Sequence, residues 1–314
     1  MAAICANKGV ADDRIIVGTG IGWRKIDGYW YFFNGDGTLA TSTWKKDSTG
    51  WCYLVEDGKM LTSCWAKDSK GYCWIGSDGY VTTATKWIKV DGVWYHITNG
   101  YRDQNKWMKD SKGWCWLDAD GKMVANQWVK DSKGYCWVDS SGYMSTATKW
   151  IKLDGDWYHI TKGYRDQSKW MKDSKGWCWL QADGKMLTNG FAKDSKGMCY
   201  IAADGYMPVA TKWVKVDGIW YHITKGYMDT SKWFKDSKGW CYVGADGKMV
   251  TDGFAPDSHG QCWIGPEGYM LEETQLVDFE GDTYYIVDGY MQVSCTAEID
   301  GVEYTFGEDV KLIQ

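Results

Sequence analysis

The chain has 314 residues, of which 44% are apolar and 16% aromatic, and it contains 23 Trp, 38 Gly and only 3 Pro. The formal net charge is -5 with Lys and Asp interleaved, which argues against nucleic acid as a partner, because a polyanion needs a concentrated basic surface. No stretch approaches the roughly 18 consecutive apolar residues of a membrane helix, so no transmembrane segment is predicted, and any ligand is expected to be neutral or cationic.

The first 22 residues differ from the rest of the chain. Residues 1–22 contain no repeat, and they lack the charged segment followed by an apolar segment that marks a signal peptide. We expect them to form an N-terminal linker, or the remnant of an upstream segment such as an export signal or a partner domain.

From Trp23 onward the sequence repeats a unit of 20 to 22 residues that begins with an aromatic side chain. Every third unit is of the same type, as those of Trp44 and Trp107 are, so three unit types alternate. Self-similarity at this period is typical of stacked arrays, in which each unit buries its apolar face against its neighbours. The units begin at Trp23, Trp44, Trp65, Trp87, Trp107, Trp128, Trp150, Trp170, Phe191, Trp213, Trp233, Phe254 and Leu276, with a partial unit near Thr296.

Each unit is predicted to be a β-hairpin. The run WYHI at residues 94–97 consists of strand formers, and the preceding pair Asp91-Gly92 is a strong signal for a hairpin turn. A single hairpin is only marginally stable in water, so the hairpins must stack. The sequence therefore predicts an all-β fold, a repetitive β-hairpin solenoid that forms a superhelix with about three hairpins per turn. Residues 23–275 would hold about twelve repeats, and residues 276–314 would be degenerate repeats that cap the array.

Eight of the 11 cysteines occupy one repeat position. Strand neighbours alternate faces, so Trp114 and Trp116 are expected on one side and Cys115 on the other. Some units hold Tyr at this position, which favours buried thiols that pack as small apolar groups. Disulfides between adjacent hairpins remain an alternative, whereas zinc is disfavoured because the sequence has no CxxC pair. The cysteines are Cys52, Cys73, Cys115, Cys136, Cys178, Cys199, Cys241 and Cys262, and the tyrosines are Tyr95, Tyr158 and Tyr221.

Candidate catalytic or metal-binding residues do not stand out from the periodic background. His96, His159 and His222 recur once in every third unit, and we interpret them as polar residues on a half-exposed strand face, while His259 is isolated in a turn. Nearly every Asp and Ser belongs to a repeated KDSKG turn that is expected to be solvated surface. The sequence therefore predicts no enzyme in this chain, no cofactor and no metal site.

Tryptophan pairs seven residues apart, such as Trp44 with Trp51 and Trp107 with Trp114, are the most informative feature. Two indoles of one hairpin and an aromatic side chain of the next would form an open-sided box. The electron-rich ring faces of such a box attract a quaternary ammonium, with about 0.5–2 kcal/mol for each good contact. Methionines just after the DGK turns would close the floor with polarizable contacts. Stacked aromatic rings also bind the apolar faces of sugars, so the box alone leaves both ligands open.

The succession of Trp, Gly, an aromatic run and DGKM resembles the choline-binding or cell-wall-binding repeats of Gram-positive surface proteins, autolysins and phage lysins. Related repeats occur in glucan-binding proteins and clostridial toxins, and the resemblance covers about residues 23–306. It implies that choline of teichoic acids is held between consecutive hairpins by the leading Trp, the aromatic residue seven positions later, an aromatic residue of the next hairpin and often a Met. The implied wall pairs are Trp23 with Trp30, Trp44 with Trp51, Trp65 with Tyr72, Trp87 with Trp94, Trp107 with Trp114, Trp128 with Tyr135, Trp150 with Trp157, Trp170 with Trp177, Trp213 with Trp220 and Trp233 with Trp240, and the methionines are Met60, Met123, Met144, Met186 and Met249.

Several units depart from the family pattern. Cysteine replaces the middle aromatic residue in eight units, and the units of Phe191 and Phe254 carry Met198 and Gln261 where a wall is expected. In the last units Thr283 and Glu303 replace the second wall, so these units are expected to close the solenoid without binding. Arg102 and Arg165 lie where other units have Met, and a cation there would repel choline or indicate an anionic or sugar group nearby.

Three hypotheses for function follow. The first is a non-catalytic cell-wall-binding module that recognises choline-decorated teichoic acid, or another cell-wall glycopolymer, at the bacterial cell surface. The second is a module of an adhesin or toxin that binds a glucan or a host glycan. The third is the targeting half of an autolysin or phage lysin, in which case the parent protein would be a hydrolase and a phage protein would stay cytoplasmic until lysis.

Overall fold

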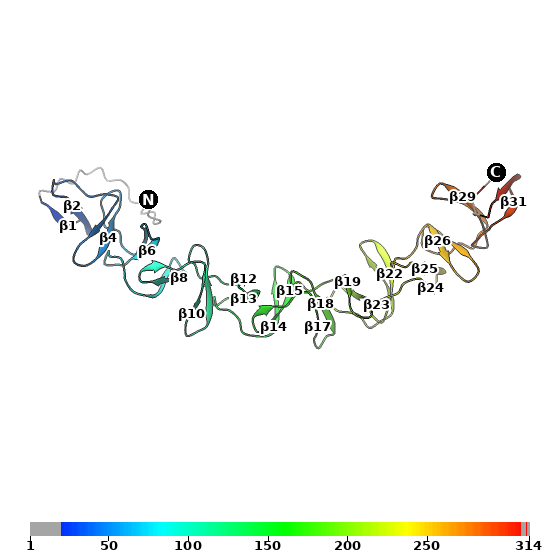
Figure 1. The fold of residues 1–314 in the computed structure, drawn as a ribbon, viewed down its shortest axis with the longest axis horizontal. Helices are drawn as coiled ribbons and strands as arrows, with labels where there is room; N and C mark the ends of the chain where they lie inside the picture. Colours follow the sequence, from blue (N-terminus) through cyan, green and yellow to red (C-terminus); the bar gives the residue numbers. More distant parts are fainter. Residues whose placement is uncertain (1–19, 309–311, 313–314) are drawn as a thin grey trace. The chain divides into compact units, whose positions relative to one another are not determined.

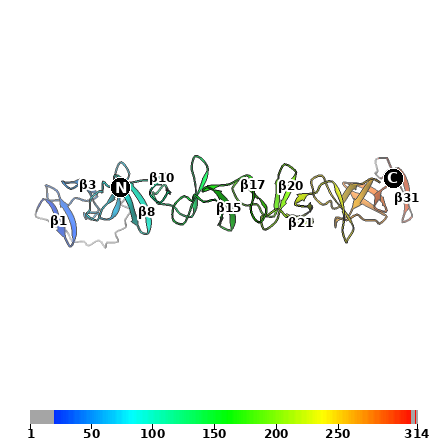
Figure 2. The same cartoon turned by 90° about the horizontal axis from the view of Figure 1, so that it is seen from below.

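The computed structural model of the chain describes residues 20–308 and 312, and in this part of the chain every regular element is a β-strand. The expected linker at residues 1–22 lies almost wholly outside these residues. The prediction of an all-β hairpin solenoid is confirmed, because the hairpins follow one another along the chain (Figure 1 and Figure 2). Among the described residues, no helix is long and apolar enough to cross a membrane. The contacts divide the chain into two compact units, residues 1–148 with 160–165, and residues 149–159 with 166–314.

The hairpins fall into three types that alternate in the order C, A, B. Types A and B have a four-residue turn of the Asp-Ser-Lys-Gly kind, and type C has a two-residue turn. The type A hairpins pair β3 (Thr43–Lys46) with β4 (Trp51–Leu54), β10 (Lys106–Lys109) with β11 (Trp114–Leu117), β17 (Lys169–Lys172) with β18 (Trp177–Leu180), and β24 (Lys232–Lys235) with β25 (Trp240–Val243). The type B hairpins pair β5 (Cys64–Lys67) with β6 (Tyr72–Ile75), β12 (Gln127–Lys130) with β13 (Tyr135–Val138), β19 (Gly190–Lys193) with β20 (Met198–Ile201), and β26 (Gly253–Pro256) with β27 (Gln261–Ile264).

Four of the five type C hairpins in the described residues are followed by a short additional strand. The five hairpins pair β1 (Gly22–Ile26) with β2 (Tyr29–Phe33), β7 (Lys86–Val90) with β8 (Val93–Thr98), β14 (Lys149–Leu153) with β15 (Asp156–Thr161), β21 (Lys212–Val216) with β22 (Ile219–Thr224), and β28 (Gln275–Phe279) with β29 (Asp282–Val287). The short strands are β9 (Tyr101–Arg102), β16 (Tyr164–Arg165), β23 (Tyr227–Met228) and β30 (Tyr290–Met291), and a final two-residue-turn hairpin pairs β31 (Cys295–Ile299) with β32 (Val302–Phe306). The short strand joins a type B hairpin to the following type C hairpin, as in the sheet β5-β6-β9-β8-β7.

The turn residues explain why the chain reverses where it does. In the type C turn Asp91 has φ 48° and Gly92 has φ 83°, and two successive positive values are what a tight hairpin turn of matching twist requires. In the longer turns the leading Asp accepts hydrogen bonds from the backbone of its own turn, as Asp47 does from the amides of Thr49 (2.8 Å) and Gly50 (3.2 Å).

The fully buried core consists of apolar side chains, one from the second strand of each hairpin. These side chains are at most 1% exposed, and they are Phe33, Leu54, Ile75, Ile97, Leu117, Val138, Ile160, Leu180, Ile201, Ile223, Val243, Ile264, Ile286 and Phe306. The repeated cysteines lie two residues before these side chains in types A and B, and each is 0% exposed. All eight are free thiols, which confirms the packing interpretation. The fully buried part of the core therefore consists mainly of aliphatic and thiol groups, and most tryptophans are left partly exposed around it, although Trp65, Trp137 and Trp263 are buried.

Burial makes the repeated thiols unreactive in the folded chain. Desolvation, together with the charge of the nearby turn Asp, raises the pKa of Cys115 to about 11 and the pKa of Cys136 to about 12. We expect a soluble aromatic disulfide reagent at pH 8 to leave these eight thiols unmodified in the native protein and to titrate them after unfolding. Four or more disulfides among them, found in protein unfolded without reductant, would contradict the packing assignment.

Candidate functional site

Two walls of each box come from one hairpin. In β10 and β11, Trp107 pairs across the strands with Trp116, and Trp114 lies two residues before Trp116, so the three indoles share one face of the hairpin. Trp107 is half-buried, with its ring 5.5 Å from that of Trp116 in an edge-to-face contact. The second wall is much more open, and Trp114 is 46% exposed. The structure thus places the predicted pair Trp107 and Trp114 side by side, with ring surface left for a ligand.

The floor of the box comes from the segment that follows the next hairpin. The backbone amide of Met144 donates to the carbonyl of Trp114 (2.6 Å), and Met186 does the same to Trp157 (2.8 Å). Met60, Met123 and Met249 make the equivalent bond to Trp30, Trp94 and Trp220, each at 2.8 Å. The five predicted methionines are therefore all brought to the predicted Trp pairs. In the Trp44 box the equivalent residue is Val81, whose amide donates to Trp51 (2.7 Å).

The third aromatic wall is a tyrosine from two hairpins further along, and not from the next hairpin as expected. Its hydroxyl donates to the leading Asp of the intervening turn, so one box uses residues of three successive hairpins. Eight such bonds of 2.8–3.0 Å are present in the described residues, namely Tyr80 to Asp47, Tyr101 to Asp68, Tyr143 to Asp110, Tyr164 to Asp131, Tyr206 to Asp173, Tyr227 to Asp194, Tyr269 to Asp236 and Tyr290 to Asp257.

Each of these bonds holds a carboxylate beside the aromatic rings. Burial alone would raise the pKa of Asp68, but hydrogen bonds from the Tyr101 hydroxyl and from the amides of Lys70 and Gly71 outweigh it and hold the pKa below its ordinary value. The same bond, with burial, raises the pKa of Tyr101 to about 12. The Asp is therefore ionised and the Tyr neutral at pH 7, so the box combines ring faces with a fixed negative charge. The expectation that KDSKG turns are solvated surface is wrong for their leading Asp.

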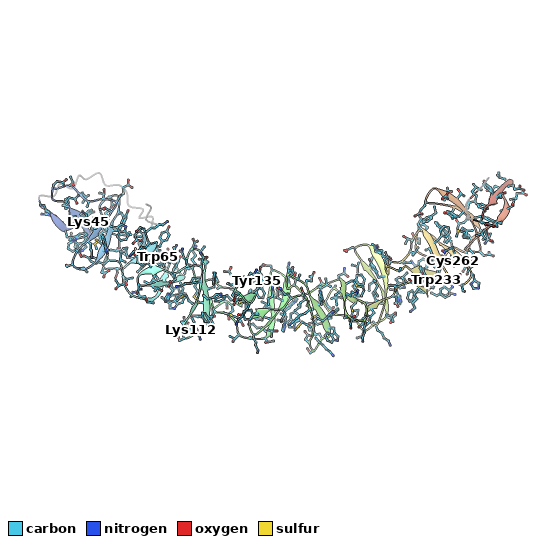
Figure 3. The ribbon with its side chains drawn as sticks, in the orientation of Figure 1. Lys45, Trp65, Lys112, Tyr135, Trp233 and Cys262 are labelled. Carbon is cyan, nitrogen blue, oxygen red and sulfur yellow. The ribbon has the colours of Figure 1, made fainter. Side chains whose placement is uncertain are left out.

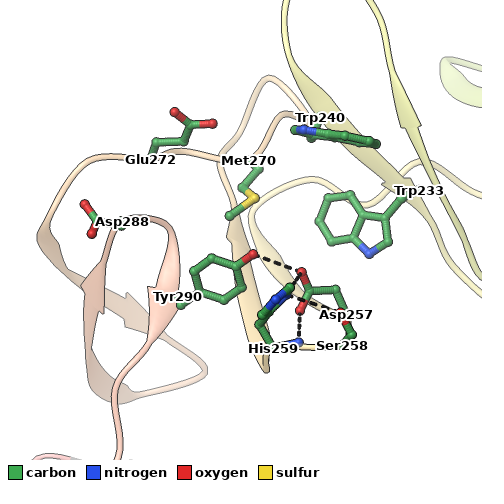
Figure 4. Close-up of a pocket in the computed structure, with 9 residues that line it drawn as sticks. All are labelled: Trp233, Trp240, Asp257, Ser258, His259, Met270, Glu272, Asp288 and Tyr290. Atoms are coloured by element: carbon green, nitrogen blue, oxygen red, sulfur yellow. Dashed lines mark hydrogen bonds and ion pairs between the residues drawn. The ribbon is translucent and has the colours of Figure 1, made fainter.

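Five boxes enclose well-defined cavities, and each cavity lies within one compact unit. Their volumes are about 610 Å³ at Trp233, 360 Å³ at Trp44, 340 Å³ at Trp87, 310 Å³ at Trp170 and 270 Å³ at Trp150. Figure 4 shows the largest, in which Trp233 and Trp240 of one hairpin lie opposite Tyr290, with Met270 between Trp240 and Tyr290 and Asp257 below. All five cavities belong to type A or type C hairpins.

The largest cavity differs from the others at its rim. Its turn carries His259 where the cavities at Trp44 and Trp87 carry Lys70 and Lys112, and it is also lined by Glu272 and Asp288. Tyr290, its third wall, belongs to the residues expected to cap the array without taking part in a site. The C-terminal repeats therefore have no tryptophan pair that could form a box of their own, but they complete the box at Trp233 and Trp240.

Two of the predicted pairs form boxes that are filled from within the protein. The guanidinium carbon of Arg102 lies 4.2 Å from the ring centroid of Tyr72 and 5.5 Å from that of Trp65. Arg165 lies in the same way over Tyr135 (4.1 Å) and Trp128 (5.5 Å). Trp65 and Tyr135 are labelled in Figure 3. The predicted pairs Trp65 with Tyr72 and Trp128 with Tyr135 are thus assembled, but Arg covers the faces offered to a ligand.

The histidines of the type C hairpins are buried, and the expectation of a half-exposed strand face is wrong. His96 and Asp103 are each 8% exposed, and the His96 Nδ1 is hydrogen bonded to the carboxylate of Asp103, which also accepts from Thr98 and Lys106. Such pairing satisfies polar groups that would be costly to bury alone. Within the described part of the chain, no group of three or more His, Cys, Asp or Glu side chains could hold a metal ion.

The third wall and the turn Asp were missed at the sequence level, although a signal existed. The residue after the connecting Gly alternates as Lys59, Tyr80 and Tyr101, and this cycle of one Lys and two Tyr repeats with every three units. Each Tyr follows the leading Asp of a turn of the Asp-Ser-Lys-Gly kind by 33 residues, whereas the same separation before each Lys leads to a type C hairpin, which has no turn of that kind. The choice between Tyr and Lys at this position therefore indicates which boxes have a third wall.

Family comparisons bear directly on these hairpins. The family described as "Choline-binding repeat" matches residues 20–65, and the family described as "Putative cell wall binding repeat" matches residues 85–100, 148–162 and 211–225. Four segments of the chain therefore resemble choline-binding or cell-wall-binding repeats. The last three matched segments are the type C hairpins led by Trp87, Trp150 and Trp213, so the match includes the first two walls of those boxes.

Solved structures of an autolysin and of two choline-binding proteins are similar to this chain. The modular autolysin LytC from Streptococcus pneumoniae has 20% identity and a TM-score of 0.43, over 93% of this chain and 52% of that chain. Choline binding protein F from the same organism has 24% identity and a TM-score of 0.36, over 73% of this chain and 92% of that one. The choline-binding domain of CbpL, also from S. pneumoniae, has 24% identity and a TM-score of 0.17, over 82% and 100%. The chain spans about half the length of LytC, and no curated protein matches the sequence significantly.

The tyrosine-to-aspartate bond predicts how the stacked hairpins respond to mutation. Tyr143→Phe keeps the ring but removes the bond to Asp110. We expect the free energy of unfolding to fall by about 1 kcal/mol, below the usual range for a hydrogen bond to a charged group because both residues are partly exposed to solvent. Urea unfolding of the variant, with Tyr95→Phe as the control lacking an Asp partner among the described bonds, measures the difference. Equal losses in both variants would contradict the assignment.

The depressed pKa values of the turn aspartates predict a dependence on pH. Because the folded-state pKa lies below the ordinary value of 3.8, the stabilisation is complete above that pH and is lost as the pH falls through the folded-state value. We expect a nearly constant melting temperature from pH 7 to pH 5 and a fall below about pH 4. A melting temperature that declines steadily from pH 7 would mean that other groups dominate.

Proposed function

We propose that the chain is a non-catalytic cell-wall-binding module that recognises choline through boxes built from three successive hairpins. The observation that carries the proposal is the combination of three aromatic rings with one ionised Asp, as in Trp150, Trp157, Tyr206 and Asp173. Trp150 Nε1 (3.1 Å) and the Tyr206 hydroxyl (2.9 Å) both donate to Asp173, so the box is fixed before any ligand arrives. A trimethylammonium group cannot donate strong hydrogen bonds, so ring faces and a nearby negative charge are the groups that attract it.

Eight boxes share this design and are the proposed sites. They belong to the pairs Trp23 with Trp30, Trp44 with Trp51, Trp87 with Trp94, Trp107 with Trp114, Trp150 with Trp157, Trp170 with Trp177, Trp213 with Trp220 and Trp233 with Trp240, and their second walls are 41–49% exposed. Each ring contact contributes about 0.5–2 kcal/mol, so a single box binds weakly. Several boxes on one polymer raise the overall affinity through effective concentration. A polymer that carries many choline groups, such as a choline-decorated teichoic acid at the cell surface, is therefore the proposed partner.

A carbohydrate is the second candidate ligand, and one observation supports it. The cavity at Trp44 is lined not only by Trp51 and Tyr101 but also by Asp68, Ser69 and Lys70. These side chains offer hydrogen bonds to hydroxyl groups, which the sequence alone did not place beside the rings. A glucan or host glycan would stack on the indoles and bind this polar rim. A targeting role beside the catalytic domain of a lysin is compatible with either ligand.

The pair Trp107 and Trp114 tests the proposed function. Leu at either position keeps apolar volume but loses the ring face, so we expect one choline equivalent to be lost while the fold and the other sites remain, because sites in a solenoid couple mainly to their neighbours. Equilibrium dialysis measures the stoichiometry, and circular dichroism checks the fold. Trp116→Leu is the control, because Trp116 is the cross-strand partner of Trp107 but forms no wall of the box.

The uncharged analogue 3,3-dimethylbutanol distinguishes recognition of the choline cation from recognition of a neutral ligand such as a carbohydrate. It matches the shape of choline without the charge, and we expect it to bind much more weakly. If it binds as well as choline, or if Trp114→Leu binds like the wild type, the boxes do not recognise a cation and the carbohydrate proposal takes precedence.

We further propose that residues 276–314 act as a cap that also completes the last box. Truncation after residue 275 removes Tyr290 and exposes β26 and β27, so we expect lower solubility and the loss of the site at Trp233 and Trp240. Tyr290→Ala in the full chain should lose that site without a change in solubility. A truncated protein that keeps every choline equivalent would contradict this role.

A further inference from the structure

The type B boxes at Trp65 and Trp128 already contain a cation. The Arg102 guanidinium stacks at 4.2 Å on Tyr72, and Arg165 repeats this geometry at 4.1 Å on Tyr135. The second walls of these two boxes, Tyr72 and Tyr135, are half-buried, whereas the second walls of the eight open boxes are 41–49% exposed. The apolar stem of Arg102 also packs on Gly121, where an added Cβ would lie 2.7 Å from it, so the side chain is held in place. A guanidinium over an aromatic face is the same kind of contact that a quaternary ammonium makes.

The three-hairpin arrangement explains why type B boxes differ from the others. The hairpin that follows Trp65 is of type C and ends its first strand with the two-residue turn Asp91-Gly92, so no turn of the Asp-Ser-Lys-Gly kind reaches this box. The position that supplies the third-wall Tyr elsewhere is Lys122, whose side chain is paired with Asp120 (3.5 Å). The two rings of a type B hairpin therefore have neither the third ring nor the carboxylate, and Arg occupies the space.

The four type B hairpins of the chain provide an internal comparison. Arg is present in the two hairpins that keep both aromatic walls, Trp65 with Tyr72 and Trp128 with Tyr135. In the hairpins of Phe191 and Phe254 the second wall is Met198 or Gln261, and the residue equivalent to Arg102 is Met228 or Met291. Met228 packs against the hydrophobic core around Tyr200 and Val214. Arg thus occurs where there is an aromatic pair to occupy, and an apolar residue occurs where there is not.

We propose that Arg102 and Arg165 are built-in occupants of two ligand-type boxes, and that they set the number of choline groups that the chain can bind. Each guanidinium contributes the cation of its own box, so free choline is excluded from these two positions while the eight open boxes stay available. This inference rests on the proposed function of the open boxes, and it assigns a specificity-determining role to two residues of the repeat.

The test is to remove the internal cation and count the ligand. We would measure choline binding by equilibrium dialysis for the wild type and for the double variant Arg102→Ala with Arg165→Ala. The expected result is two additional, weaker choline equivalents in the double variant, and a larger rise in melting temperature on adding choline than in the wild type. The variant Arg102→Gln with Arg165→Gln keeps the side chain as far as Cδ without the guanidinium group or its charge, and it should give the same gain if the Ala variant folds poorly.

Two matched controls define what would overturn the inference. Arg102→Lys with Arg165→Lys keeps a cation in each box and should add no equivalent, and Met228→Ala removes the equivalent residue of a box that has no aromatic pair and should also add none. An unchanged stoichiometry in both the Ala and Gln variants would overturn the inference, as would a wild type that binds ten equivalents. A wild type that binds no choline would instead overturn the proposed function.

Discussion

The hydrogen bond from a tyrosine hydroxyl to the aspartate that leads an earlier turn is the interaction on which the proposed sites depend. The Tyr lies in the segment after one hairpin, and the Asp lies in the turn of the preceding hairpin. Both residues lie against the tryptophan pair of the hairpin that comes before these two. The bond at once fixes the third ring, orients the carboxylate and ties successive repeats together. A box therefore belongs to three hairpins and not to one, which explains why the final hairpins have no complete box although they complete that of Trp233.

The fold and the proposed sites use different side chains of the same strands. Alternation along each second strand sends Cys115 and Leu117 into the core and leaves Trp114 and Trp116 on the outer face. The aliphatic side chains and the thiols carry the burial that stabilises the stack, so the indoles are free to stay partly exposed. Large apolar rings left in water are costly for an isolated domain, and repeated exposure of the same ring in eight hairpins is typical of a binding surface.

Much of this architecture could be predicted from the sequence, because its signals are local. The turn at Asp91-Gly92, the strand alternation and the seven-residue spacing of Trp107 and Trp114 each depend on one hairpin. The third wall could not be placed in this way, because Tyr143 reaches the Trp87 box only through the stacking of three hairpins. The burial of His96 was missed for a similar reason, since its partner Asp103 lies beyond the end of the strand. The position of Arg102 was noted as an obstacle to a cation, but its role as the occupant of the box required the coordinates.

The most direct measurement is a crystal structure of the chain grown with saturating choline. The account predicts trimethylammonium density between the aromatic rings of the type A and type C boxes, beside the aspartate that accepts the tyrosine hydroxyl, with Arg102 and Arg165 still stacked in the type B boxes. Choline bound at Trp65 or Trp128 in place of Arg, or boxes that stay free of choline while a sugar binds them, would contradict it.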